Sequence, residues 1–249
     1  MLDLHCHLLP GIDDGPECMA EAIEMARIAC VEGIQQAVLT PHLHIGRYDN
    51  DIDSIERAGQ VFAAELRRCE VPLQVTYAAE VRICPELMGL VESCRAPFLG
   101  ELRGKKVLLL EFPHSHIPVG SEKMIAWLLT HDVLPMIAHP ERNKDVMRKL
   151  EKIFPFVEMG CMLQVTAGSV AGRFGPAVLK TARTLLERGF VHVLASDAHN
   201  LGVRKPELES GRAAAERIVG AAASWALVRD MPFAISGSRF VKLQQRSAG

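Results

Sequence analysis

Short apolar runs alternate with longer amphipathic segments along this chain. The runs are rich in Val, Ile and Leu and show little polar alternation, which is typical of strands buried on both faces of a parallel sheet. They predict seven strands, at residues 1–5, 37–40, 73–78, 106–111, 133–138, 161–165 and 191–195.

The segments between these runs place apolar residues three and four positions apart, as an amphipathic helix does. They predict six helices, at residues 17–32, 51–69, 121–130, 143–154, 176–188 and 210–228. No Pro-, Gly- or Ser-rich linker and no repeat of fixed period divides the chain. Strands and helices that alternate in this way predict a parallel α/β fold, and a barrel of this length would be compact.

Composition narrows the classes of protein that fit. The chain has 249 residues, with 28 Lys and Arg against 30 Asp and Glu, so its formal net charge is −2. A charge this close to neutral leaves no electrostatic footprint for nucleic acid or anionic lipid. Aromatic residues make up only 5%, which argues against a base-stacking surface, whereas 49% hydrophobic residues are enough for a continuous core.

The seven cysteines give information about the compartment. Their number is odd and no pair has Cys-x-x-Cys spacing, so neither a disulfide framework nor a zinc ribbon is expected. Free thiols suit a reducing compartment. The first residues do not resemble a signal peptide, and the longest near-apolar stretch, 218–228, is too short to cross a bilayer. We therefore expect a cytoplasmic protein with no membrane insertion.

Residues of the types that bind metal ions follow six of the seven predicted strands. Catalytic groups of α/β barrels gather at the carboxyl ends of the strands, so these residues should meet there. Such regularity is hard to explain as packing, and it predicts a metal centre. The candidate ligands are His5, His7, Asp14, His42, Glu80, Glu111, His139, Asp197 and His199.

Two neighbours of these candidates need a separate interpretation. Cys6 stands between two histidines, but in a strand it would point to the opposite face, so we interpret it as a core thiol. Asp13 is interpreted as structural, although the residue types alone leave the choice between Asp13 and Asp14 open.

The ligand types restrict the metal and the number of ions. A mixed set of imidazoles and carboxylates suits Mn²⁺, Fe or Zn²⁺ better than Cu(I) or an iron–sulfur cluster. Nine ligands exceed the need of one ion, so we expect two or three divalent ions that share a carboxylate. Three such ions among four carboxylates would leave a positively charged pocket, which attracts a phosphate dianion.

Other routes to phosphate chemistry are absent from the sequence. Cysteine-dependent tyrosine phosphatases need a thiolate with Arg six positions later, and none of the seven cysteines is followed by Arg at that distance. The chain also has no Gly-x-x-x-x-Gly-Lys loop and no dinucleotide-binding fingerprint.

The order of these motifs resembles a known family. Residues 3–15 read DLHCHLLPGIDDG, and TPH (40–42), LEFP (110–113), HPER (139–142) and SDAHN (196–200) follow. Together they resemble PHP (polymerase and histidinol phosphatase) domains and, within these, the CpsB/CapC-type bacterial tyrosine-protein phosphatases. The likeness covers residues 1 to about 215. We expect one domain over 1–249, in which the segment 231–249 is the least clearly matched.

This resemblance implies a fold, a cofactor and an activity. The fold would be a distorted (β/α)7 barrel with a trinuclear, often manganese-dependent site. The activity would be hydrolysis of phosphotyrosine on the C-terminal tail of a bacterial tyrosine kinase that controls capsule or exopolysaccharide synthesis. The nine candidates above would be the ligands, with Glu111 as the bridging carboxylate.

Four further residues would contact the substrate. The resemblance implies that Arg142 and Arg204 hold the phosphate. Arg47 and Tyr48 follow His42 and lie within reach of an incoming segment. Arg47 could pair with phosphate or with acidic flanking residues, and Tyr48 could pack against the substrate ring.

Two alternative functions remain open. The first is a PHP phosphatase that acts on a small molecule such as histidinol phosphate, with the same metal cluster. The second is a catalytically inactive, metal-bound regulatory module, against which the complete ligand set argues. The oligomeric state is left open. The other histidines (His44, His114, His116, His131 and His192) are expected to be loop or surface residues.

Overall fold

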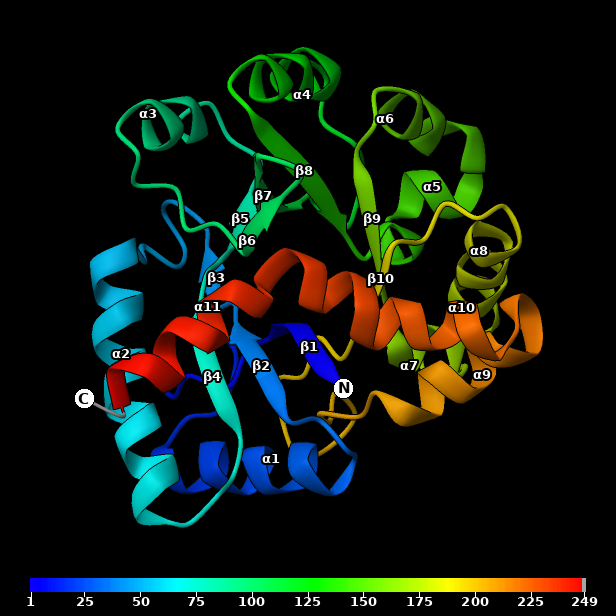
Figure 1. Ribbon diagram of the computed structural model, residues 1–249. Helices are drawn as coiled ribbons and strands as arrows, with labels where there is room; N and C mark the ends of the chain where they lie inside the picture. The colour runs from blue at the N-terminus through cyan, green and yellow to red at the C-terminus, as the bar shows by residue number, and fades with distance from the viewer. Residues whose placement is uncertain (248–249) are drawn as a thin grey trace.

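Parallel strands form the centre of this molecule and helices surround them (Figure 1). The computed structural model describes the backbone of residues 1–247 and the side chains of residues 1–241. Its strands are β1 (Leu2–Cys6), β2 (Gln36–Leu39), β3 (His42–Leu43), β4 (Gln74–Tyr77), β5 (Glu80–Arg82), β6 (Gly100–Leu102), β7 (Lys105–Glu111), β8 (Val133–Ala138), β9 (Met162–Thr166) and β10 (Val193–Ala195).

The strands close into a barrel. One sheet has the order β1-β2-β4 and the other the order β10-β9-β8-β7-β5-β3. Because β3 and β5 directly continue β2 and β4, the two sheets run into each other. The barrel closes where His5 O accepts from Asp197 N and Ala198 O accepts from His7 N, both at 2.8 Å. If β2 with β3, and β4 with β5, are each counted as one interrupted strand, the barrel has seven parallel strands. The predicted (β/α)7 barrel is therefore confirmed.

The helices follow the predicted alternation in outline. They are α1 (Met19–Val31), α2 (Ile52–Arg68), α3 (Leu87–Glu92), α4 (Ser121–Thr130), η1 (Pro140–Arg142), α5 (Lys144–Arg148), η2 (Leu150–Ile153), α6 (Phe154–Glu158), α7 (Ala167–Val170), α8 (Pro176–Glu187), α9 (Glu209–Val219), α10 (Ala221–Trp225), η3 (Ala226–Asp230) and α11 (Met231–Ser247). Asp51 caps α2 through a reciprocal capping box with Ser54, which explains why that helix begins as predicted.

Two predicted helices were wrong as continuous elements. The segment 143–154 breaks into α5, η2 and the start of α6, because Lys149 is extended at φ −147° and ψ 98°. The segment 210–228 divides at Gly220, whose φ of 85° ends α9. The predicted elements do not include β3, β5, β6, α3, η1, α7 or α11.

Alternate residues of the strands form a small apolar cluster inside the barrel. α11 crosses one end of the barrel, where it contacts β1, β4 and β6 (Figure 1). Ile235 and Phe240 of α11, each only 1% exposed, close this cluster. The strand residues in it are Leu2, Leu4, Val38, Val107, Leu109, Met136, Ala138, Met162, Val193 and Ala195, and Ala78, between β4 and β5, belongs to it as well.

Toward the carboxyl ends of the strands, the inward-facing side chains change from apolar to ionisable. Because side chains two residues apart share a face, Glu80, Glu111 and Asp197 continue the inward-facing rows. β1 departs from this rule, since its register against β2 shifts between Asp3 and Cys6. Such an irregularity re-aims side chains, so His5 can face inward directly after Leu4.

Cys6 lies on the other side of its strand. It is fully buried within the larger core between the barrel and the helices, as predicted for a core thiol. Within the described residues, no helix combines the length and the apolar character needed to cross a membrane. The last two residues of the predicted domain, 248–249, lie outside the described residues.

A glycine tests the packing of α11 against the barrel. A Cβ added to Gly100 in β6 would lie 2.0 Å from the backbone oxygen of Ile235. Gly100→Ala should therefore destabilise the fold by about 1–3 kcal/mol, measured as the free energy of unfolding in urea. The control is Gly89→Ala in α3, where a Cβ meets nothing within 4 Å. A fully stable Gly100→Ala variant would show that α11 is not packed as described.

Candidate metal centre

The structure brings all nine predicted ligands together at the carboxyl end of the barrel. Every one of them belongs to at least one group whose ligand atoms lie within 4.8 Å of one another. The groups are His7, Asp14, His42 and His199; His5, His7 and Glu80; His5, His139 and Asp197; and His42, Glu80 and Glu111. All except Asp14 and His42 are buried. Their placement agrees with the strand-end prediction.

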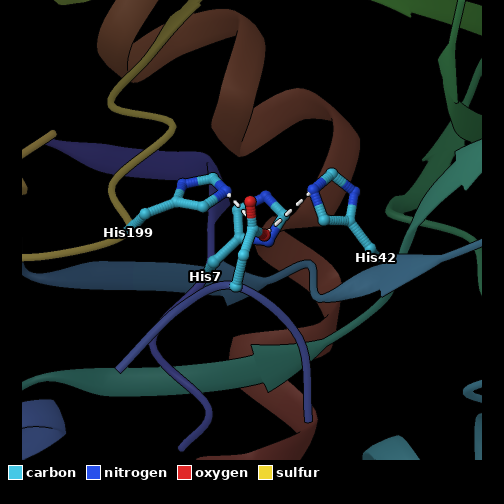
Figure 2. A group of neighbouring side chains, drawn as sticks. His7, His42 and His199 are labelled. Atoms are coloured by element: carbon cyan, nitrogen blue, oxygen red, sulfur yellow. Dashed lines mark ion pairs between the residues drawn. The ribbon is translucent and has the colours of Figure 1, made fainter. Parts of the chain in front are cut away.

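Asp14 occupies the open side of the cluster. Figure 2 shows His7, His42 and His199 converging, with dashed lines for the ion pairs of His42 and His199. Asp14 Oδ1 lies 3.2 Å from His42 Nε2 and 3.4 Å from His199 Nε2. The ring centroids of His7 and His199 are 3.8 Å apart. Asp14 is therefore the carboxylate that enters the cluster.

Asp13 lies behind the cluster and orients it. His7 Nδ1 donates to Asp13 Oδ2 at 2.6 Å, and the same oxygen accepts from the backbone N–H of His42 at 2.9 Å. Its other oxygen accepts from Gly15 N at 2.9 Å. Burial acts to raise the pKa of Asp13, but the charge of His7 and these hydrogen bonds lower it overall. Asp13 thus fixes the orientation of His7 and the position of His42.

Two more histidines are oriented in the same way. His5 Nδ1 donates to Gln164 Oε1, and His199 Nδ1 donates to the backbone oxygen of Asp197, both at 2.9 Å. Because these oxygens only accept, the proton is on Nδ1 and the lone pair is on Nε2. In each case Nε2 faces the cluster, which is the tautomer that metal-bound histidines adopt.

Glu80 lies at the centre of the cluster. Its Oε1 is 2.7 Å from His139 Nε2, and its Oε2 is 2.9 Å from His42 Nδ1 and 3.4 Å from His5 Nε2. Glu111 lies farther from the same rings, at 3.8 Å from His42 and 4.0 Å from His139. The distances favour Glu80 rather than Glu111 as a carboxylate shared between ions.

The electrostatics of the cluster fit bound cations. Among the described residues, Glu80 Oε2, Glu111 Oε2 and His199 Nε2 are buried and make no well-directed hydrogen bond, although ionisable side chains lie within 3.4 Å of each. Burial and the charge of Glu80 raise the pKa of Glu111 to about 8. Burial would lower the pKa of His42, but the charge of Glu80 and the hydrogen bond with Asp14 raise it to about 11. Carboxylates and lone pairs crowded in this way need positive charge, which divalent ions supply.

A pocket of about 210 Å³ opens beside the cluster. It is lined by Asp14, His42, His44, Arg47, Tyr48, Arg82, Glu111, His114, His139, Arg142 and Arg204. Four of these residues are arginines, whereas only two are carboxylates. The excess of positive charge suits an anion.

Arg142 and Arg204 both bind Asp197. Arg142 Nη2 donates to Asp197 Oδ2, and Arg204 Nη2 donates to Oδ1 at 3.0 Å. Burial would raise the pKa of Asp197, but these two guanidinium groups hold it well below its usual range. The Nε atoms of both arginines are buried without a hydrogen-bond partner in the described part of the chain. Each arginine therefore keeps a donor free beside the pocket.

The sequence analysis missed three pocket residues. Arg82 Nη2 pairs with Glu111 Oε2 at 2.9 Å. The sequence carried a signal for this residue, because Arg82 stands two positions after Glu80 and so shares its inward-facing side of the strand. His44 and His114 lie outside the named helices and strands, as expected of loop residues, but they also line the pocket, which the sequence did not indicate. Gln164, which orients His5, also carried such a signal, because it lies on the inward-facing row of β9 that includes Met162.

Arg47 and Tyr48 both line the pocket, but the ring of Tyr48 also packs against His42. The Tyr48 ring stacks on His42 with centroids 5.4 Å apart and an interplanar angle of 9°. Arg47 Cζ lies 5.1 Å from the centroid of the Tyr48 ring. Tyr48 thus supports His42 from the loop, and the exposed guanidinium of Arg47 covers the tyrosine.

The family of this chain follows from its match to known sequences. A family model described as "Capsular polysaccharide synthesis, CpsB/CapC" matches residues 1–235. The chain belongs to the CpsB/CapC family. The match extends beyond the predicted limit near residue 215 and includes the beginning of α11.

Named relatives of the CpsB/CapC family support this assignment. Tyrosine-protein phosphatase YwqE of Bacillus subtilis is 38% identical over 205 residues, which cover 82% of this chain and 79% of the relative. Tyrosine-protein phosphatase CpsB of Streptococcus agalactiae serotype III is 26% identical over 213 residues, covering 84% and 86%.

A solved structure of the same family has the same fold. It comes from work on YwqE of Bacillus subtilis and CpsB of Streptococcus pneumoniae, described as metal-dependent tyrosine phosphatases. It matches this chain with a TM-score of 0.87 and 33% identity, over 94% of this chain and 93% of the other. The predicted family and barrel type are therefore confirmed.

Asp13 gives a test of how the cluster is held. Asp13→Asn keeps the size of the side chain but removes the charge that faces His7 Nδ1, so metal affinity should fall by about 10–100-fold. Titration of the metal-free protein by calorimetry measures the change. Asp132→Asn, in an exposed turn at φ 55°, is the control and should bind metal normally. Unchanged affinity in Asp13→Asn would contradict the orienting role.

Proposed function

We propose that this chain is a metal-dependent protein-tyrosine phosphatase. The observation that carries the proposal is the convergence of nine buried or half-buried ligand groups beside an arginine-rich pocket. Neither feature alone would be sufficient, because ligand clusters serve many reactions and arginine pockets bind many anions. Together they suit hydrolysis of a phosphate monoester, and the named relatives are tyrosine-protein phosphatases.

We propose that the nine residues hold two to three divalent ions, most simply Mn²⁺, with Fe and Zn²⁺ as alternatives. Ions held here would act as Lewis acids toward phosphate oxygens and would acidify an attacking water. The central position of Glu80 supports its role as the shared ligand, in place of the predicted Glu111. Metal analysis tests this choice, since Glu80→Gln should lose more metal per chain than Glu111→Gln. An equal or reversed order would restore Glu111 as the shared ligand.

The arginines of the pocket bind the substrate phosphate in this proposal. Asp197 fixes Arg142 and Arg204 in position, and their Nε groups remain free to donate hydrogen bonds. In this proposal the acceptors are the equatorial oxygens of the substrate phosphate. A tyrosine leaving group has a pKa of about 10, so its departure needs little help from a general acid. This agrees with a pocket that presents arginines rather than a dedicated acid.

We also propose a partner and a compartment. The partner is the phosphorylated C-terminal tail of a bacterial tyrosine kinase in capsule or exopolysaccharide synthesis, which the family description supports. The compartment is the cytoplasm, since all seven cysteines are unpaired. Residues 1–249 are proposed to act as one domain, supported by the packing of α11 against β1, β4 and β6.

Metal dependence separates this mechanism from a thiol mechanism. Chelation with EDTA should abolish hydrolysis of para-nitrophenyl phosphate, and added Mn²⁺ should restore it. Alkylation with iodoacetamide should spare the activity, because no cysteine is among the residues that line the catalytic pocket. Burial also raises the pKa of Cys161 to about 12 and that of Cys6 well above its ordinary value, so these thiols react slowly. Activity that survives EDTA and is lost on alkylation would overturn the proposal.

Substrate preference separates the two enzyme hypotheses. We expect a higher kcat/KM for phosphotyrosine peptides than for histidinol phosphate, measured at steady state. Arg47→Ala should lower kcat/KM for the peptides, since Arg47 lies exposed at the pocket. Arg57→Ala, on the exposed side of α2, is the matched control. A preference for histidinol phosphate would replace the tyrosine-phosphatase proposal while leaving the metal centre intact.

A further inference from the structure

Three exposed aliphatic side chains lie on loops that also supply residues to the catalytic pocket. Ile45 is 46% exposed, Val203 is 68% exposed and Val119 is fully exposed. Each lies on a loop that also supplies the pocket: Ile45 follows His44, Val203 precedes Arg204, and Val119 is in the segment that begins after β7. Three separate loops that contribute to a charged site thus also present apolar groups to solvent.

A groove of about 540 Å³ lies behind one of these loops. Its lining comes from the beginning of α4 and the residues before it, and from α5, η2 and α6. Figure 1 shows where α4, α5 and α6 lie. This volume is within the range of sites that accept small ligands or side chains, about 300–1,000 Å³. The apolar residues of its lining are Ile117, Pro118, Val119, Pro155 and Phe156, and the charged ones are Glu122, Lys123, Asp145 and Lys152.

The charged residues in the groove leave its apolar floor accessible. Asp145 Oδ2 lies 3.0 Å from Lys152 Nζ and accepts from the backbone N–H of Ile117 at 3.2 Å. This carboxylate is therefore already neutralised and hydrogen-bonded. Glu122 and Lys123 are exposed at the edge and balance each other in charge. An apolar side chain can enter without burying an unpaired charge.

The loop between the pocket and the groove is held in place. Asn143 Nδ2 donates to Pro113 O at 2.8 Å and to His116 O at 3.1 Å. Lys144 N donates to His114 O at 2.8 Å, and Ser121 Oγ donates to Pro118 O at 2.7 Å. These bonds fix both ends of residues 113–120. A surface organised before binding costs little conformational entropy when a partner docks.

Geometry connects the groove to the catalytic pocket. His114 lines the pocket and Ile117 lines the groove, so the two sites are separated by at most about 10 Å of chain. An extended peptide rises about 3.3 Å per residue, so it would cross this distance in about three residues. A phosphotyrosine in the pocket would therefore place a residue three or four positions away at the groove.

We propose that residues 113–120 and the adjoining groove bind the substrate polypeptide, taking an apolar side chain three or four residues from the phosphotyrosine. This inference rests on the proposed tyrosine-phosphatase function. The occupant is the substrate chain itself, because one fixed loop supplies His114 to the pocket and, three residues later, Ile117 to the groove. Val119, fully exposed on that loop, covers the backbone or the apolar side chain of the peptide.

The test is a leucine scan of a phosphotyrosine peptide. Leu replaces Ala at each of the four positions on either side of the phosphotyrosine. For the wild-type protein, kcat/KM should rise by about tenfold for Leu three or four positions away on one side, as expected when an apolar group fills a pocket. Val119→Asp should lose this preference and hydrolyse para-nitrophenyl phosphate at the wild-type rate.

The control variant is Val61→Asp, on the exposed face of α2, which should keep the leucine preference. A flat scan for the wild-type protein, or an unchanged preference in Val119→Asp, would overturn the docking surface and leave the phosphatase proposal standing. Hydrolysis of para-nitrophenyl phosphate but of no peptide would overturn both. A flat scan with Val119-dependent sedimentation on phosphatidylserine vesicles would assign the surface to a membrane instead.

Discussion

The structure depends on one electrostatic constraint, which is the burial of carboxylates and imidazole lone pairs in a single layer of the barrel. Glu80, Glu111 and Asp197 are each at most 2% exposed. Their carboxylate oxygens lie within a few ångströms of histidine ring nitrogens. A desolvated carboxylate without a counter-charge is costly. Bound cations and the surrounding guanidinium groups meet this need, so the metal centre and the arginines form one electrostatic unit.

The rest of the barrel keeps this layer in place. Below it, the inward-facing side chains are apolar, and Ile235 and Phe240 of α11 close that end against water. Beside it, Asp3 joins β1 to the strand that closes the barrel, since Asp3 Oδ2 accepts from Ser196 Oγ at 2.5 Å. The ionisable side chains of the candidate ligands thus gather toward the carboxyl ends of the strands. The site is accordingly open to substrate from one side.

The sequence predicted which candidate ligands lie close together better than it predicted the elements that carry them. The ligands follow strand ends, and a parallel barrel brings strand ends together whatever the details of each strand. Arg82 and Gln164 were missed although each shares a face with a residue two positions away. The inward aim of His5 could not be read from alternation, because a register shift in β1 reverses the alternation after Leu4. Breaks at Lys149 and Gly220 depend on backbone conformations that apolar periodicity does not report.

Asp197 links recognition of phosphate to the metal layer. It belongs to the group that includes His5 and His139, and it also accepts from both Arg142 and Arg204. Because Asp197 contacts both sets of residues, it would set the distance between cations bound at the candidate ligands and the two arginines. A phosphate bound as proposed would lie between two fixed positive regions, with its position determined before it binds. Such preorganisation stabilises charge in the transition state without a further cost of rearrangement. Both arginines are anchored close to the strand ends: η1, which carries Arg142, follows β8 directly, and Arg204 O in the loop after β10 accepts from His199 N at 2.8 Å.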